Sequence, residues 1–231
     1  MLERHDYADE GTALTGWIAR PVGTPKAAIL IFPTIANITP AIEQRARMLA
    51  DARYLAMVAD FYGEPVASFE ASLPLAEKLR ADTDHYRQRL AASLTAMRAL
   101  AGELPIAVIG YCMGGQAALE LARIGADVVL AASFHGLLAT RKPAQVPFAG
   151  RILVCHGDAD PLVPREQVIA FWEEMDRVDN NWHFHSYSGV RHGFTDPGSD
   201  ARGMEAVRYN ASADRQSWGA LTGLLEEVLA S

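Results

Sequence analysis

The sequence has few cysteines and no long apolar segment. Its 231 residues include only Cys112 and Cys155, too few for a disulfide framework, and a chain of this length buries enough apolar surface to fold without one. No stretch approaches the roughly 18 consecutive apolar residues of a membrane span. The first residues also lack the apolar segment of a signal peptide, so we expect a cytoplasmic location and no membrane partner.

Basic residues are also in deficit. The chain has 21 Lys and Arg against 28 Asp and Glu, a formal net charge of −7. No segment combines clustered basic residues with aromatics, as nucleic-acid-binding surfaces do, so no nucleic-acid partner is expected. With 50% hydrophobic residues the composition is that of a globular protein, and we expect a single domain over residues 1–231. Nothing in the sequence indicates an oligomeric state.

Apolar segments alternate with helical patterns along most of the chain. Strands are predicted at residues 27–32, 54–59, 106–109, 128–134, 152–155 and 182–187, and helices at 40–53, 84–100, 115–124, 166–178 and 214–230. This alternation is typical of α/β proteins, in which helices cover both faces of a mostly parallel sheet. Residues 60–83 show no clear pattern, and such a segment often lies over the site of an α/β domain.

The most informative segment is 106–116, in which a predicted strand leads into Gly-x-Cys-x-Gly and then into a helix. This pattern indicates a nucleophile elbow with Cys112 at its centre. A tight strand-to-helix turn needs small residues beside the nucleophile, and the helix amino terminus stabilises the negative charge of a reactive thiolate. On this pentapeptide alone, a small buried cysteine in a glycine-rich turn is an equally good interpretation.

An acid and a histidine follow in two later segments. Residues 156–160 have the sequence His-Gly-Asp-Ala-Asp directly after a predicted strand, and residues 191–194 have the sequence Arg-His-Gly-Phe after the last predicted strand. The order nucleophile, acid, histidine is that of the α/β-hydrolases. By spacing alone the acid is either Asp158 or Asp160.

With these three motifs the sequence resembles the dienelactone hydrolase family of α/β-hydrolases, from about residue 27 to residue 229. The resemblance implies the α/β-hydrolase fold and hydrolysis of an ester or lactone without a cofactor. It implies that Cys112 is the nucleophile, that His192 is its base, and that Asp160 orients His192. Asp158 is then left as a turn-stabilising side chain.

The resemblance also implies an oxyanion hole and shows two departures from the family pattern. The hole would take the backbone N–H groups of Met113 and Ile35. Thr34 stands where the family has a glutamate in the early loop, and Asp196 stands where it has an arginine that helps to grip a substrate carboxylate. The departures predict a preference for neutral over carboxylated substrates.

Several other side chains are weaker candidates. Arg80 and Arg87 could replace the missing cation, although surface arginines are usually solvated or paired. His135 follows a strand at the sheet edge where ligands of α/β proteins bind, so it is a candidate pocket residue, with a structural hydrogen-bonding role as the alternative. His183 and His185 face the same side of a predicted strand, but no third ligand stands at an obvious spacing, so no metal is expected.

The expected mechanism is two-step acyl transfer through a thioester on Cys112. Because a thiolate is itself a good leaving group, enol lactones and activated esters are the expected substrates. A hypothesis from another class is a non-catalytic or thiol-redox-sensing protein that retains the fold and an exposed low-pKa thiol.

Overall fold

The computed structural model describes residues 2–230. Its strands are β1 (Glu3–Asp9), β2 (Thr12–Ala19), β3 (Ala27–Phe32), β4 (Tyr54–Val58), β5 (Ile106–Tyr111), β6 (Leu130–Phe134), β7 (Arg151–Gly157) and β8 (Asn181–Tyr187). Its helices are α1 (Pro40–Asp51), α2 (Phe69–Ala81), α3 (Thr83–Ala101), α4 (Met113–Arg123), α5 (Arg165–Arg177), α6 (Ala211–Leu229) and the short 3-10 helix η1 (Pro197–Arg202). None of these helices has both the length and the apolar character that crossing a bilayer requires.

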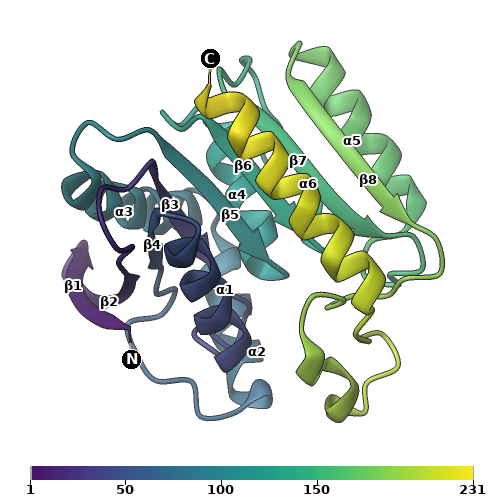
Figure 1. Ribbon diagram of the computed structural model, residues 1–231. Helices are drawn as coiled ribbons and strands as arrows, with labels where there is room; N and C mark the ends of the chain where they lie inside the picture. The colour runs from purple at the N-terminus through teal and green to yellow at the C-terminus, as the bar shows by residue number, and fades with distance from the viewer. Residues whose placement is uncertain (1, 231) are drawn as a thin grey trace. The chain divides into compact units, whose positions relative to one another are not determined.

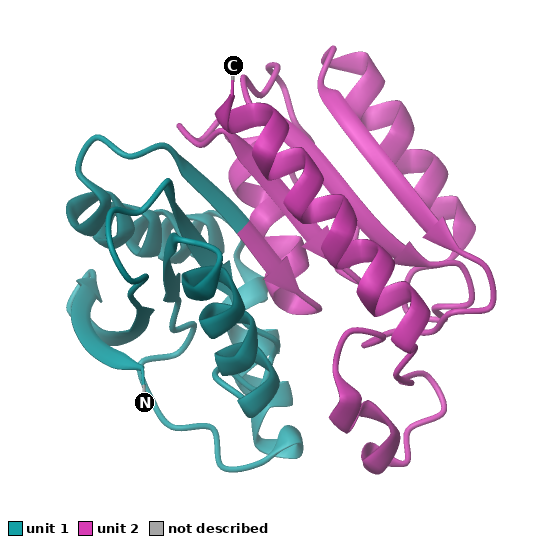
Figure 2. Cartoon of the chain, in the orientation of Figure 1, with its two compact units in different colours: residues 1–108 teal, residues 109–231 magenta. Residues whose placement is uncertain are grey.

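The chain divides into two compact units, residues 1–108 and 109–231, and the division falls within β5 (Figure 2). The strand order is β1-β2-β4-β3-β5 in the first unit and β5-β6-β7-β8 in the second, eight strands in all. β1 and β2 are antiparallel, as are β2 and β4, whereas β3 with β4, β6 with β7 and β7 with β8 are parallel. This confirms the predicted α/β fold with a mostly parallel sheet. A single domain over residues 1–231 stays a prediction.

The first unit contains two elements that the sequence pattern did not predict. The β1–β2 hairpin has mostly exposed or half-buried side chains in β1, so its apolar alternation is weak, and its turn uses Glu10 and Gly11 at φ 43° and 85°. Helix α2 lies within residues 60–83, the segment in which the sequence shows no clear pattern. Ser68 caps this helix by accepting a hydrogen bond from the Ala71 N–H, and Pro74 inside it obscures the helical pattern.

The second unit places α4 and α6 against its central strands. Helix α4 packs on β6, and α6 packs on β6 and β7. Figure 1 shows the yellow helix α6 in front of these strands and α4 behind them. All residues of β5 and β6 are buried, which explains their continuous apolar sequence, since a parallel strand covered on both faces needs apolar side chains on each. The loops that follow β5, β6, β7 and β8 carry the candidate site.

Candidate active site

Cys112 stands in the sharp turn between β5 and α4, with φ 57° and ψ −117°. A non-glycine residue with positive φ is strained, and such strain is often retained at functional sites. The turn is possible because Gly110 has no side chain: a Cβ there would lie 1.8 Å from the Gly114 carbonyl oxygen. Cys112 is partly exposed and occupies the N-cap of α4, where the partial positive charge of the helix favours a thiolate.

Asp160 and His192 form a buried pair in the same unit. The His192 Nδ1 lies 2.7 Å from Asp160 Oδ2, and because a carboxylate only accepts, Nδ1 carries the donated proton. The other Asp160 oxygen accepts from the Leu162 N–H at 2.9 Å. Both side chains are almost fully buried, at 0% exposed for Asp160 and 5% for His192. The pair therefore fixes the ring orientation and leaves Nε2 of His192 for proton transfer.

The charge state of His192 depends on its two neighbours. Burial alone would lower its pKa, but the negative charge of the Cys112 sulfur and the Asp160 carboxylate outweigh burial and raise the pKa of His192 to about 10. His192 Nε2 is itself buried without a hydrogen-bond partner among the described residues. A negative sulfur on Cys112 and a positive ring on His192 would stabilise each other.

Asp158, the alternative acid, and Cys155, the second cysteine, have contacts of other kinds. Asp158 forms an ion pair with Arg165 at 2.7 Å, and this hydrogen bond lowers the pKa of Asp158. The contact of Asp158 with Arg165 fits the turn-stabilising interpretation, which stays a prediction. Cys155 is fully buried in β7, and burial raises the pKa of its thiol to about 12. A thiol with this pKa is unreactive at neutral pH.

The early loop lies in the first unit and is held by residues that the sequence motifs did not single out. Thr34 Oγ1 accepts from the Ala36 N–H, and the Ile35 carbonyl accepts from the Tyr62 hydroxyl at 2.9 Å. Asn37, at φ 59°, donates through Nδ2 to the buried carboxylate of Asp60 at 2.7 Å. The one signal in the sequence for these contacts was Asp60, an acidic residue just past the carboxyl end of the buried strand β4. Substrate contact by Thr34 and an oxyanion role for Ile35 stay predictions.

The two charged positions linked to substrate recognition are engaged elsewhere. Arg80 lies on α2 in the first unit, and its Nε donates to the Ala76 carbonyl within the same helix. Asp196 caps η1 by accepting from the Gly198 N–H, and it pairs with Arg202 at 2.5 Å. The negative charge expected to repel a substrate is therefore largely neutralised within the protein. A substrate-binding role for Arg80 stays a prediction.

His135 follows β6 and is buried, with 2% of its surface exposed. Its Nδ1 accepts from the Cys112 N–H at 3.2 Å, and its Nε2 lies 2.9 Å from Thr195 Oγ1. Both ring nitrogens therefore contact the protein, which fits the hydrogen-bonding alternative, and a substrate contact by His135 stays a prediction. No separate signal in the sequence pointed to Thr195, which directly follows the His-Gly-Phe motif.

The strand β8 carries His183 and His185 as exposed residues. His183 Nε2 lies 3.0 Å from an Arg151 guanidinium nitrogen. Within residues 2–230, no group of three or more His, Cys, Asp or Glu side chains is arranged to hold a metal ion.

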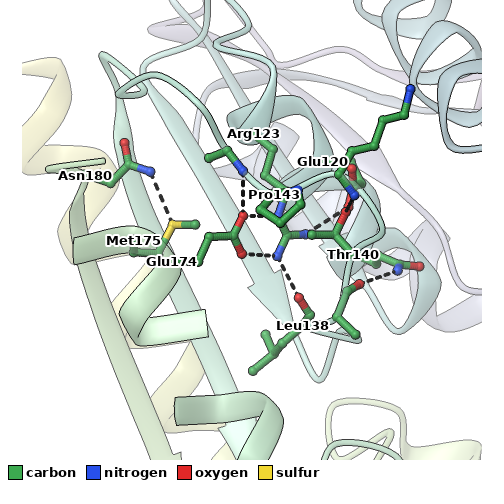
Figure 3. Close-up of polar contacts among 12 residues, drawn as sticks. Glu120, Arg123, Leu138, Thr140, Pro143, Glu174, Met175 and Asn180 are labelled. Carbon is green, nitrogen blue, oxygen red and sulfur yellow. Dashed lines mark hydrogen bonds and ion pairs between the residues drawn. The ribbon is translucent and has the colours of Figure 1, made fainter. Parts of the chain in front are cut away.

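A buried charged cluster, which no sequence motif indicated, fixes the carboxyl end of α4 (Figure 3). Arg123 donates to both carboxylate oxygens of Glu174 at 2.8 and 2.9 Å, to Glu120 at 2.9 Å and to the Leu138 carbonyl at 2.6 Å. Glu174 also accepts from the Ala144 N–H. Arg123 thereby connects α4 to α5 and to the loop after β6.

Comparison with known proteins is decisive for the family. The profile of the Dienelactone hydrolase family matches residues 14–229. The chain belongs to the dienelactone hydrolase family. This membership confirms the resemblance that rested on the three motifs, and it places the chain among the hydrolases of the α/β-hydrolase superfamily.

Two solved structures are similar to this chain in fold, and one curated relative is similar to it in sequence. A dienelactone hydrolase-like promiscuous phosphotriesterase from metagenomic libraries is 30% identical, with a TM-score of 0.90 over 99% of this chain and 98% of its own. The solved structure of m3DLH is 33% identical, with a TM-score of 0.91 and the same coverage of both chains. A probable 2-oxo-3-(5-oxofuran-2-ylidene)propanoate lactonase of Bradyrhizobium sp is 27% identical over 92% of this chain and 89% of its own. Together they support hydrolysis of an ester or lactone.

Proposed function

We propose that this protein hydrolyses activated esters or enol lactones by two-step acyl transfer, with Cys112 as nucleophile, His192 as general base and acid, and Asp160 as the residue that orients His192. The observation that carries the proposal is the buried 2.7 Å contact between His192 Nδ1 and Asp160 Oδ2 in the unit that presents Cys112 on its elbow. The lactonase relative supports the lactone part of the substrate class.

In the first step the Cys112 thiolate attacks the carbonyl carbon and forms a tetrahedral oxyanion. The backbone N–H groups of Met113, in the first turn of α4, and of Ile35 are the proposed donors to this oxyanion. As the intermediate collapses, the bond to the leaving oxygen breaks and His192 donates its Nε2 proton to that oxygen. A thioester remains on Cys112.

In the second step neutral His192 removes a proton from water, and the resulting hydroxide attacks the thioester carbonyl. The acid is released, and the thiolate is regenerated beside protonated His192. Asp160 keeps Nδ1 protonated throughout, so Nε2 alone exchanges protons. The fully buried carboxylate also stabilises the imidazolium that is present when the thiolate attacks.

The test compares Cys112→Ala with Cys155→Ala on a chromogenic aryl ester and on an enol lactone. We expect Cys112→Ala to lose turnover, by about 1,000-fold or more, and Cys155→Ala to retain it, because only the first cysteine stands on the elbow. Mass spectrometry of a quenched reaction should find the acyl group on the peptide that contains Cys112. Equal turnover of wild type and Cys112→Ala would refute the assignment, and no turnover with reversible oxidation of Cys112 would favour a thiol sensor.

A further inference from the structure

His135 links two loops of the second unit through its two ring nitrogens. The Cys112 backbone N–H donates to the Phe134 carbonyl at 3.0 Å and, as a shared hydrogen bond, to His135 Nδ1 at 3.2 Å, and Nε2 lies 2.9 Å from Thr195 Oγ1. A backbone N–H can only donate, so Nδ1 is the acceptor and the ring is neutral, with Nε2–H donating to the Thr195 hydroxyl. One imidazole therefore joins the elbow that carries Cys112 to the loop that carries His192.

The same ring also packs against His192. The ring centroids of His135 and His192 are 5.1 Å apart, with an angle of 66° between the planes, and Phe194 contacts the His135 ring at 5.2 Å. This edge-on packing limits the movement of the His192 ring on the side facing His135. Because His135 is neutral, it also does not oppose a positive charge on His192.

The backbone at His135 indicates that the side chain is needed there. His135 has φ 42°, a conformation that glycine or asparagine adopts at less cost. The following residue, Gly136, approaches the first turn of α4 so closely that a Cβ on it would lie 2.7 Å from the Gly115 carbonyl carbon. A histidine kept in this strained turn, with both nitrogens engaged, fits a position that the surrounding contacts fix tightly.

We infer that His135 is a positioning residue, which sets the separation of the Cys112 sulfur from the His192 ring by connecting the elbow to Thr195. The inference rests on the proposed function only in taking these two residues as nucleophile and base. If the link is broken, the loop with His192 shifts relative to the elbow, and the attraction between thiolate and imidazolium weakens. Fewer molecules then hold the reactive thiolate at neutral pH.

The decisive variant is Thr195→Val, which removes the hydroxyl and keeps the shape, with Thr195→Ser as the matched control that restores it. Both are made in a Cys155→Ala background, so that alkylation by iodoacetamide reports Cys112 alone. We expect Thr195→Val to raise the apparent pKa of the Cys112 thiol by about half a unit or more. We also expect it to lower kcat about ten-fold, with KM within about two-fold of wild type, and Thr195→Ser to match wild type.

A second variant tests the histidine itself. His135→Asn suits the left-handed backbone and keeps an oxygen to accept from the Cys112 N–H, but it cannot reach Thr195. Its effects should equal those of Thr195→Val, and the double variant should show no further loss, because both break the same link. The thiol pKa is measured without turnover, so a shift in that pKa without any esterase activity would support the inference while refuting the proposed function.

The inference is overturned if Thr195→Val and His135→Asn lower the melting temperature but leave the alkylation profile and kcat at their wild-type values. It is also overturned if the two substitutions have additive effects on the thiol pKa, since independent contacts would then replace the link.

Discussion

At the scale of single residues, the candidate site depends on which of two neighbouring carboxylates contacts the histidine. Asp160 lies 2.7 Å from His192, whereas Asp158 is paired with the exposed Arg165. We expect Asp160→Asn to lower kcat about 100-fold or more, because an amide at that position no longer stabilises the imidazolium or fixes its tautomer. Asp158→Asn, the matched control, should retain most activity. Steady-state kinetics of folded variants measures both, and the reverse order would assign the acid role to Asp158.

A second prediction at this scale concerns the protonation of His192. Despite burial, the charges of Cys112 and Asp160 raise the pKa of His192 to about 10. In Cys112→Ala the sulfur charge is lost, so the pKa of His192 should fall, as NMR titration of the imidazole would measure. A pKa of His192 that stays near 10 in Cys112→Ala would contradict this coupling.

The raised pKa of His192 also makes the stability of the fold depend on pH. A histidine whose folded pKa lies above the ordinary value of about 6.5 contributes stability fully below that pH and loses it as pH rises toward the folded pKa. For wild type, the contribution of His192 protonation is therefore lost as pH rises toward about 10. We expect the free energy of unfolding to fall more steeply between pH 8.5 and 10 in wild type than in Cys112→Ala, as urea denaturation at each pH would show. Equal slopes would mean that His192 loses its proton at lower pH.

At the scale of elements, the buried cluster around Arg123 ties α4 to α5. Arg123 is 1% exposed and Glu174 8% exposed in this pair. Glu174→Gln should lower the free energy of unfolding by about 3 kcal/mol, because the buried guanidinium loses a charged partner. Glu43→Gln, which breaks the exposed pair with Arg47, is the matched control and should change little. An equal effect of the two substitutions would contradict a special role for the buried cluster.

The pH dependence of the stability that this cluster contributes follows from the pKa of Glu174. Burial works to raise the pKa of Glu174, but the hydrogen bond and charge of Arg123 lower it below the ordinary value. A carboxylate with a lowered folded pKa contributes stability above its unfolded pKa of about 4.5 and loses it as pH falls further. The difference in unfolding free energy between wild type and Glu174→Gln should therefore shrink below pH 4.5, and a constant difference would argue against ionised Glu174.

Several of the strands that were predicted from the sequence are those whose burial dictates their residue types, whereas β8 was predicted although none of its residues is buried. Strands β3, β5 and β6 are buried throughout, so their apolar sequences allow few alternatives. Strand β1 was missed because an exposed edge strand needs no apolar alternation, and α2 was missed because Pro74 lies within it. At the candidate site, short motifs with fixed geometry placed the elbow, the acid and the histidine. The contacts of His135, Tyr62 and Arg123 join distant segments, and no local pattern encodes them.

At the scale of the whole molecule, we expect the net charge to be the main source of any discrimination against anionic substrates. The local repulsion expected from Asp196 is reduced, because this carboxylate pairs with Arg202 and caps η1. The formal net charge of −7 remains, and it repels a carboxylated substrate over a distance that salt controls. The Debye length falls from about 30 Å at 10 mM salt to about 8 Å at 150 mM. Discrimination against anionic substrates should therefore weaken as salt is added.

The final prediction compares neutral and carboxylated aryl esters with the same leaving group. Raising salt from about 10 to about 150 mM should increase kcat/KM for the carboxylated ester about two-fold or more relative to the neutral one, because only the former feels the net charge. Asp196→Asn should leave this ratio nearly unchanged at 150 mM salt, since Arg202 already neutralises the carboxylate. A large increase in kcat/KM for the carboxylated ester in Asp196→Asn would instead show that local repulsion by Asp196 causes the discrimination. A preference for the carboxylated ester at low salt would instead require a cation near the substrate, and Arg80 and Arg87 would be the first to substitute.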